Sequence, residues 1–236
     1  MPGRPVQPPH ARDCFVVLPD SPAGQAAAGR LRFPDGGDPD RTVPGCGRVF
    51  RYPSGRPWLV VRTPLRRVST ALAGADAVVL IGPDEVPEPE LVRELCASRD
   101  NAELHGRLAR KLPGTQHVIS RVRGETWVRG TASGLRRVYA TEGSGPCFAS
   151  DRPAVLAHLT GAALDETALA LRLLDFVPHP LGGRPVWRGV TETDPAHALV
   201  LGADGTSATR RWWHAPDAEH PMAEGALRMS NNADRV

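Results

Sequence analysis

Several features that mark common classes of protein are scarce or absent in this sequence of 236 residues. No apolar run approaches the roughly 20 residues that a membrane-spanning helix needs, and the start, Met1 to Pro5, lacks the apolar core of a signal peptide. The cysteines (Cys14, Cys46, Cys96 and Cys147) are widely separated and include no Cys-x-x-Cys pair, which excludes the usual spacing of a zinc site. We therefore expect a cytoplasmic protein with reduced thiols, no membrane partner and no bound metal.

Lysine is almost missing as well. Of the 29 basic residues only Lys111 is a lysine, and the arginines are interspersed with 26 acidic residues. The net charge is only +3, and no long basic stretch provides the positive face that DNA or RNA requires. The sequence therefore indicates no nucleic-acid partner.

Glycine and proline, in contrast, are abundant, with 24 residues of each. Together they make up about a fifth of the chain, which is below the share that is typical of a disordered low-complexity protein. A chain of this length that is 41% hydrophobic can bury a full core. We expect a disordered tail at residues 1–13, and a long loop with little structure at residues 19–44, where Gly, Pro and Asp are concentrated.

The amino-terminal half contains strand patterns followed by a helical pattern. Residues 48–52 and 57–61 flank a Gly-containing turn and predict a β-hairpin. Residues 14–18 and 76–82 are short apolar runs that are typical of buried strands. Residues 89–112 carry leucines at helical spacing and are followed by Pro-Gly, which predicts one long helix.

From residue 116 onward the pattern is a meander of short strands separated by Gly-rich turns. Ser150 or Asp151 is expected to cap a helix that begins at Pro153. Asp165 is expected to cap a second helix, which runs to Leu174. The predicted strands are residues 116–122, 125–129, 135–140, 146–149, 185–190 and 197–202, with an Asp204-Gly205 turn behind them. Antiparallel strands with a few packed helices make the expected fold class α+β.

Short segments of this half occur in an order that resembles a known family. They are Gly124-Glu125-Thr126-Trp127-Val128, Gly134-Leu135-Arg136-Arg137-Val138-Tyr139, Cys147-Phe148-Ala149-Ser150-Asp151-Arg152, Pro185-Val186-Trp187-Arg188-Gly189-Val190, Ala198-Leu199-Val200-Leu201, Asp204-Gly205 and Trp212-Trp213. Their order resembles the amino-terminal, glutaminase-like domain of asparagine synthetase relatives. Within that family it is most similar to the macrolactam synthetases that close lasso peptides. The resemblance covers about residues 46–226.

The resemblance implies a four-layer αββα sandwich of the N-terminal-nucleophile hydrolase type, with the nucleophile lost. In glutamine-using relatives the catalytic cysteine is the first residue of the mature chain, and its α-amine serves as the base. Here Pro2 follows Met1, and the sequence has no Asn-Gly pair of the kind that binds glutamine in the family. Cys14 would become terminal only after cleavage behind Asp13, and we interpret it as a packed strand residue. We expect this chain alone to be inactive.

In the family a second domain carries out the reaction, and a Ser-Gly-Gly-x-Asp-Ser loop in it holds the pyrophosphate of ATP. This sequence has no such loop, and Gly130 to Gly134 and Leu181 to Arg184 are interpreted as turns. We therefore expect no cofactor in this chain, and ATP with Mg²⁺ only in a missing synthetase domain. The implied partners are the precursor peptide and that synthetase domain, in cis or in trans.

The expected organisation is a tail at 1–13, a glutaminase-like domain at 14–215 and the start of a linker to the synthetase domain at 216–236. The favoured function is that of the amino-terminal domain of an ATP-dependent lasso-peptide macrolactam cyclase, truncated before its synthetase domain. Two alternatives stay open. One is a fragment of a glutamine-hydrolysing asparagine synthetase, and the other is a stand-alone peptide-binding module that acts with a separate synthetase chain.

Two further groups of residues receive structural interpretations. Trp212-Trp213 is interpreted as a packing anchor between domains, because large aromatic rings commonly fill such contacts. His158, His179 and His197 lie far apart without metal-binding spacing, and we interpret them as structural.

Overall fold

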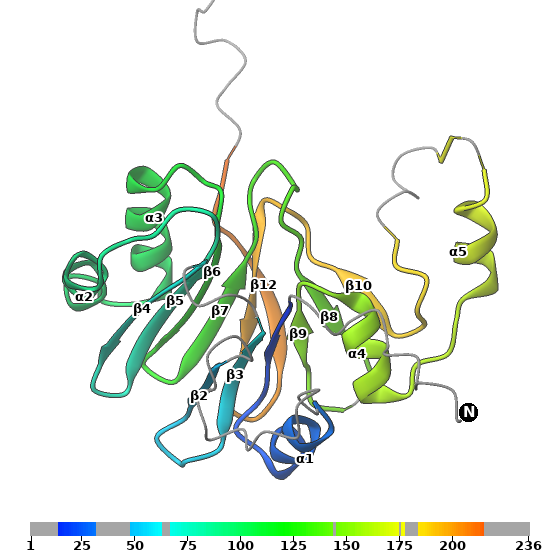
Figure 1. Ribbon diagram of the computed structural model, residues 1–236, viewed down its shortest axis with the longest axis horizontal. Coiled ribbons are helices and arrows are strands. Elements are labelled where there is room, and N and C mark those ends of the chain that lie inside the picture. Colours follow the sequence, from blue (N-terminus) through cyan, green and yellow to red (C-terminus); the bar gives the residue numbers. More distant parts are fainter. Residues whose placement is uncertain are drawn as a thin grey trace, which may run out of the picture.

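The computed structural model describes residues 14–31, 48–62, 67–143, 145–174, 176–177 and 184–214, and all structural statements here concern these residues. Two six-stranded antiparallel sheets form the centre of the molecule, and helices cover their outer faces (Figure 1). This four-layer arrangement confirms the predicted αββα sandwich of class α+β. The expected tail at 1–13 and linker at 216–236 lie outside the described residues.

The first sheet has the strand order β10-β8-β9-β1-β3-β2. Its strands are β1 (Cys14–Val17), β2 (Arg48–Arg51), β3 (Pro57–Arg62), β8 (Tyr139–Thr141), β9 (Ala149–Ser150) and β10 (Val190–Glu192). The predicted strand at 14–18 and the hairpin around residue 54 are confirmed. The strand predicted at 185–190 is wrong, because the pairing with β8 begins only at Val190.

The second sheet has the strand order β12-β11-β7-β6-β5-β4. Its strands are β4 (Val68–Ala73), β5 (Asp76–Ile81), β6 (His117–Val122), β7 (Glu125–Arg129), β11 (His197–Leu201) and β12 (Ser207–Arg211). The sequence analysis did not predict β4 and β12. Both are edge strands, and β12 is exposed along its whole length, so it lacks the alternation of apolar residues that identifies a half-buried strand.

The helices are α1 (Pro22–Arg30), α2 (Glu88–Cys96), α3 (Asn101–Lys111), α4 (Pro153–Thr160) and α5 (Glu166–Leu171). Val16 of β1 packs in one apolar cluster with Leu156 of α4 and Ala27 of α1. Leu80 of the second sheet packs with Leu91 of α2. α5 stands apart from both sheets (Figure 1). No helix in the described part of the chain has the length and apolarity that a membrane crossing requires.

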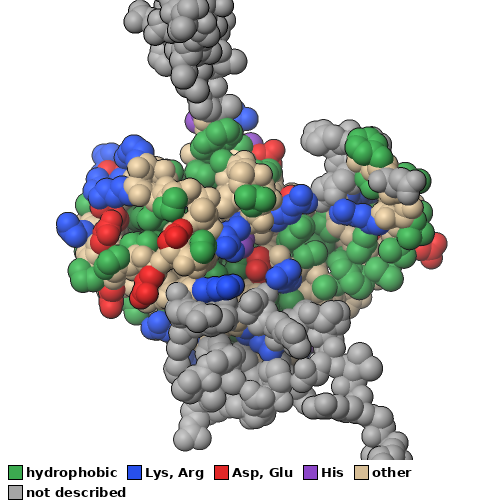
Figure 2. All heavy atoms as spheres, turned by 45° about the horizontal axis from the view of Figure 1, so that its top comes forward, with side chains coloured by type: hydrophobic (Ala, Val, Ile, Leu, Met, Phe, Trp, Pro, Cys, Tyr) green, Lys and Arg blue, Asp and Glu red, His purple; other side chains and the backbone are tan. Residues whose placement is uncertain are grey.

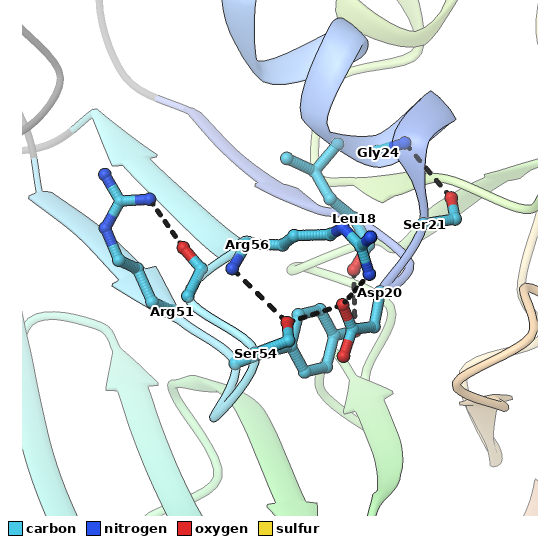
Figure 3. Close-up of polar contacts among 9 residues, drawn as sticks. Leu18, Asp20, Ser21, Gly24, Arg51, Ser54 and Arg56 are labelled. Atoms are coloured by element: carbon cyan, nitrogen blue, oxygen red, sulfur yellow. Dashed lines mark hydrogen bonds and ion pairs between the residues drawn. The ribbon is translucent and has the colours of Figure 1, made fainter.

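The expectation of a loop at 19–44 is wrong at its beginning, where α1 lies. The Ser21 hydroxyl accepts a hydrogen bond from the Gly24 amide at 3.2 Å, and Pro22 occupies the first turn, so this helix begins with a standard cap. The preceding Asp20 carboxylate accepts bonds from Ser54 at 2.7 Å and Arg56 at 3.2 Å, which ties the start of α1 to the β2–β3 turn (Figure 3). Residues 32–44 of the predicted loop lie outside the described part of the chain.

The single helix predicted at 89–112 is also wrong, because two helices occupy this range. Asp100 caps α3 by accepting a hydrogen bond from the Glu103 amide at 2.8 Å, which starts a new helix. The buried Glu94 of α2 accepts a bond from Arg107 at 2.8 Å and another from Lys111, and these bonds join the two helices. Both helices turn their leucines toward the same sheet, so the apolar spacing continues past Asp100 as if there were one helix.

Candidate functional site

The start of β1 is where the family resemblance would place a nucleophile. Cys14 is only 6% exposed and packs with Val16 and Leu18 in the layer under α1 and α4. Phe15, the next residue, lies in the layer between the two sheets. Since successive strand residues point to opposite faces, the Cys14 thiol lies on the helix-covered face of the sheet.

The last residue of β9 and the residue after it bind the two backbone polar groups of Phe15. The Asp151 carboxylate accepts a hydrogen bond from the Phe15 amide at 2.9 Å, and the Ser150 hydroxyl donates to the Phe15 carbonyl at 2.6 Å. The prediction that Ser150 or Asp151 caps α4 is therefore wrong: the N-cap is Arg152, without a side-chain cap bond. These two polar side chains satisfy the neighbouring strand rather than their own helix.

His117, the first residue of β6, faces Phe15 from the second sheet. The two rings meet edge to face with centroids 5.0 Å apart. The Nε2 atom of His117 lies 3.1 Å from the Arg137 carbonyl, and Nδ1 has no hydrogen-bond partner among the described residues. Burial lowers the pKa of His117 to about 4, so the ring is neutral at physiological pH.

These contacts hold Phe15 in place, and Cys14 beside it is buried. A catalytic thiol must be reachable and its thiolate must be stabilised, whereas Cys14 is buried among apolar side chains. The described residues contain no group of three His, Cys, Asp or Glu side chains that could hold a metal ion. The site can thus stabilise the strand, and its geometry does not support nucleophilic chemistry at Cys14.

Replacing Asp151 with asparagine is expected to raise the free energy of unfolding at pH 7 by roughly 1–3 kcal/mol. Burial raises the pKa of Asp151 from 3.8 to about 6. The folded protein therefore holds this proton more tightly than the unfolded chain, and the stability from the neutral carboxyl, complete below about pH 4, is lost as the pH rises through 6. Asparagine accepts the same hydrogen bond from the Phe15 amide without carrying a charge. The variant should therefore be more stable than wild type at pH 7 and equally stable at pH 4, where Asp151 is neutral too.

Urea unfolding of both proteins between pH 4 and 8 measures this effect. His117 affects the pH dependence of stability in the opposite direction, because its lowered pKa makes acidification destabilising. Both proteins contain His117, so its contribution cancels when their free energies of unfolding are subtracted. Asp204→Asn is the control, since hydrogen bonds in an exposed turn lower the pKa of Asp204. An Asp151→Asn protein no more stable than wild type at pH 7 would contradict the expectation.

A hollow of about 1160 Å³ lies between the start of α1, β10 and β12. Cys147 lines it, together with hydroxyl side chains such as Thr141 and Ser207. Burial raises the pKa of the Cys147 thiol, so the thiolate needed for nucleophilic attack is disfavoured. The sequence analysis assigned this cysteine no role in a site, and the structure gives it a packed position.

The remaining predicted residues lie far from the start of β1 in sequence and have structural contacts. Trp212 packs against Trp127 and Val200 on the outer face of the second sheet, while Trp213 is 36% exposed. His197 contacts Asp194 at 3.1 Å, and His158 lies on α4. His179 lies outside the described residues. Trp212 therefore packs as predicted, and its role between domains stays a prediction.

No protein-family model matches the chain, but it is similar to known proteins in sequence and in structure. Asparagine synthetase [glutamine-hydrolyzing] 3 of Bacillus subtilis (strain 168) is 36% identical over 75 residues, which are 31% of this chain and 12% of that protein. The solved structure of glutamine phosphoribosylpyrophosphate (PRPP) amidotransferase from B. subtilis, complexed with ADP and GMP, has a TM-score of 0.49 and 10% identity. That match covers 85% of this chain and 49% of the amidotransferase chain. The chain thus spans about half the length of the PRPP amidotransferase chain, and its match covers only a small part of the asparagine synthetase.

Proposed function

We propose that this chain is the amino-terminal, glutaminase-like domain of an asparagine synthetase-like enzyme that forms amide bonds with ATP, and that it serves as a scaffold without glutaminase activity. The partial identity to an asparagine synthetase supports the broader assignment. Within it we favour a lasso-peptide macrolactam cyclase, on the order of the short segments between Gly124 and Trp213. In such an enzyme a carboxyl side chain of the precursor peptide is joined to the amino terminus of the same peptide.

The burial of Cys14 at the start of β1 is the observation that carries the scaffold role. An N-terminal nucleophile needs an accessible side chain beside a free α-amine. Cys14 is 6% exposed, and its neighbour Phe15 is fixed by Ser150 and Asp151. Cleavage behind Asp13 would expose the amine of Cys14 but would leave its thiol in the helix-facing layer.

The proposal places ATP and Mg²⁺ outside this domain. The glycine-containing turn from Gly130 to Gly134 joins β7 to β8 and opens no helix, so it lacks the helix N-terminus that commonly binds phosphate. In the described part of the chain no three carboxylate or other metal-binding side chains come together. In this proposal both groups belong to a synthetase domain, and no step is assigned to them here.

Glutamate release from glutamine tests the scaffold role directly. The full chain and its Cys14→Ala variant are both expected to release no more glutamate than buffer, with a glutamine amidotransferase as the active reference. Release by wild type that disappears in Cys14→Ala would overturn the scaffold role. It would favour the alternative that the chain is part of a glutamine-hydrolysing asparagine synthetase.

The cyclase assignment needs a second measurement. The chain is combined with a synthetase domain from the same genome, ATP, Mg²⁺ and a precursor peptide, and the peptide is followed by mass spectrometry. Loss of one water from the peptide, dependent on ATP and on this chain, is the expected result. Formation of asparagine from aspartate instead would reject the cyclase. The intact mass in native cells then distinguishes a domain in cis from a module that acts in trans.

A further inference from the structure

A second hollow, here called the α3 groove, lies between the carboxyl end of α3, the turn after β7 and the residues after β12. Its volume is about 790 Å³, within the size range of sites for small ligands. It is lined by Leu112, Gln116, Arg129, Leu135, Trp212 and Trp213, among others. Leu135 is 87% exposed, and Figure 2 shows hydrophobic side chains gathered at this end of the molecule, where the described chain ends. One side of the groove is therefore apolar.

Arg129 supplies a buried positive charge to the same groove. Its side chain is 2% exposed, and the guanidinium lies 3.9 Å from the centroid of the Trp212 ring. Its Nη1 donates a hydrogen bond to the neighbouring Gly130 carbonyl at 3.3 Å, and its Nε has no partner among the described residues. Burial lowers the pKa of Arg129 to about 10, and no described carboxylate offsets that effect. A buried charge without a counter-charge is costly to keep.

Other buried charges of this fold are satisfied, which makes Arg129 an exception. Glu94 has Arg107 and Lys111 as ion-pair partners. Arg121 donates to two backbone carbonyls, of Arg51 and Ala75, at 2.9–3.0 Å. The unpartnered charge at Arg129 is thus a local property of the groove and not a general feature of the packing.

Gln116 adds a second unsatisfied donor on the same groove. Gln116 is 2% exposed, and its Nε2 atom has no hydrogen-bond partner among the described residues. Both orphan atoms, Arg129 Nε and Gln116 Nε2, are N–H donors, so the missing group must be an acceptor. A carboxylate is the acceptor that also neutralises a guanidinium, and it does so with strong charge-assisted bonds.

We propose that the α3 groove binds a carboxylate that is joined to an apolar group, namely a short peptide segment with an acidic group beside a large apolar side chain. Arg129 and Gln116 hold the carboxylate, and Leu135 and Trp213 contact the apolar side chain. The carboxylate is either an Asp or Glu side chain or a peptide carboxyl terminus. This site does not depend on the proposed function, because it requires neither a synthetase domain nor a reaction.

Four synthetic peptides test the proposal on the full chain by isothermal titration. Acetyl-Gly-Leu-Asp-Leu-Gly-amide is compared with its Asn counterpart, and acetyl-Gly-Leu-Leu with a free carboxyl terminus is compared with its amide. The charged member of at least one pair is expected to bind roughly 10-fold tighter or more, which is the usual gain from a charged hydrogen bond. The pair that shows the difference identifies the source of the carboxylate. Equal binding within both pairs would reject the site.

Arg129→Met is the decisive variant. It should abolish the preference for the charged peptide, and without peptide it should melt roughly 2–4 °C higher than wild type, because an uncompensated buried charge is removed. Arg93→Met, an exposed arginine on α2, is the matched control and should change neither property. A preference that survives in Arg129→Met would overturn the assignment.

Trp213→Ala keeps the proposal testable even where Arg129→Met fails to fold, since this ring is partly exposed. This variant should weaken the binding of the Asp and Asn peptides by the same factor, because it removes the apolar contact and leaves the charge of Arg129 in place. Unchanged affinity for both peptides would show that they bind elsewhere and would also reject the groove.

Discussion

Trp58→Ala should lower the free energy of unfolding by about 3–5 kcal/mol, the usual effect of deleting a large buried aromatic ring. Trp58 is 0% exposed and lies between the two sheets, with its ring 6.4 Å from that of Phe50. Its Nε1 atom donates to the Thr126 hydroxyl of the opposite sheet at 3.1 Å. The Arg121 guanidinium lies over the ring at 4.6 Å. Alanine would leave a cavity between the sheets and remove both polar contacts.

Urea unfolding monitored by far-ultraviolet circular dichroism measures this loss, because the signal does not depend on the deleted tryptophan. Trp58→Phe should lose less, since a ring stays in place while the bond to Thr126 is removed. Trp213→Ala is the matched control, because 36% of Trp213 is exposed, and its effect should be much smaller. Equal losses in Trp58→Ala and Trp213→Ala would contradict the position of Trp58 in the core.

Gly130→Ala is expected to destabilise the protein by about 1–3 kcal/mol or more, as overpacking against an unyielding neighbour does. A Cβ atom at residue 130 would lie 1.8 Å from the carbonyl oxygen of Arg136 and 2.9 Å from its carbonyl carbon. This oxygen accepts a hydrogen bond from the Thr131 amide at 3.1 Å. The clash is with backbone, so the turn that lines the α3 groove would have to move.

Gly29→Ala makes the same change in α1, at a position where a Cβ atom meets nothing within 4 Å. It should raise the free energy of unfolding by roughly 0.5–1 kcal/mol, because alanine favours a helix over glycine. The two variants are compared by thermal and urea unfolding, and opposite signs are expected. A Gly130→Ala protein as stable as wild type would show that the turn can relax without loss.

The elements that the sequence predicted well are those whose signal is local. The apolar run from Cys14, the Gly-containing hairpin turn near residue 54 and the Asp165 cap of α5 all lie where predicted. The Asp204-Gly205 turn, whose glycine has a φ of 86°, also lies between paired strands. In each case the residues that define the element are adjacent in the chain, so propensity and capping suffice.

Some of the predictions that failed concern residues whose partner is distant in the chain. Ser150 and Asp151 have the composition of a helix cap, but they bind Phe15, which is more than 130 residues away in sequence. The leucines of 89–112 share one face of a sheet, and their spacing does not reveal the break at Asp100. A pattern of residue types cannot distinguish a local partner from an equally suitable remote one.

The sequence by itself therefore determined the α+β class, the meander of strands, the low net charge and the absence of the usual zinc spacing, because each depends on composition or on neighbouring residues. Only the tertiary structure decided that Cys14 faces the helices, that Phe15 is clamped at the start of β1 and that Arg129 and Gln116 line one groove with N–H groups that have no described partner. The reason is physical. Which face a strand turns inward and which polar groups remain unsatisfied are set by the pairing of the sheets, and that pairing joins residues that are far apart in the chain.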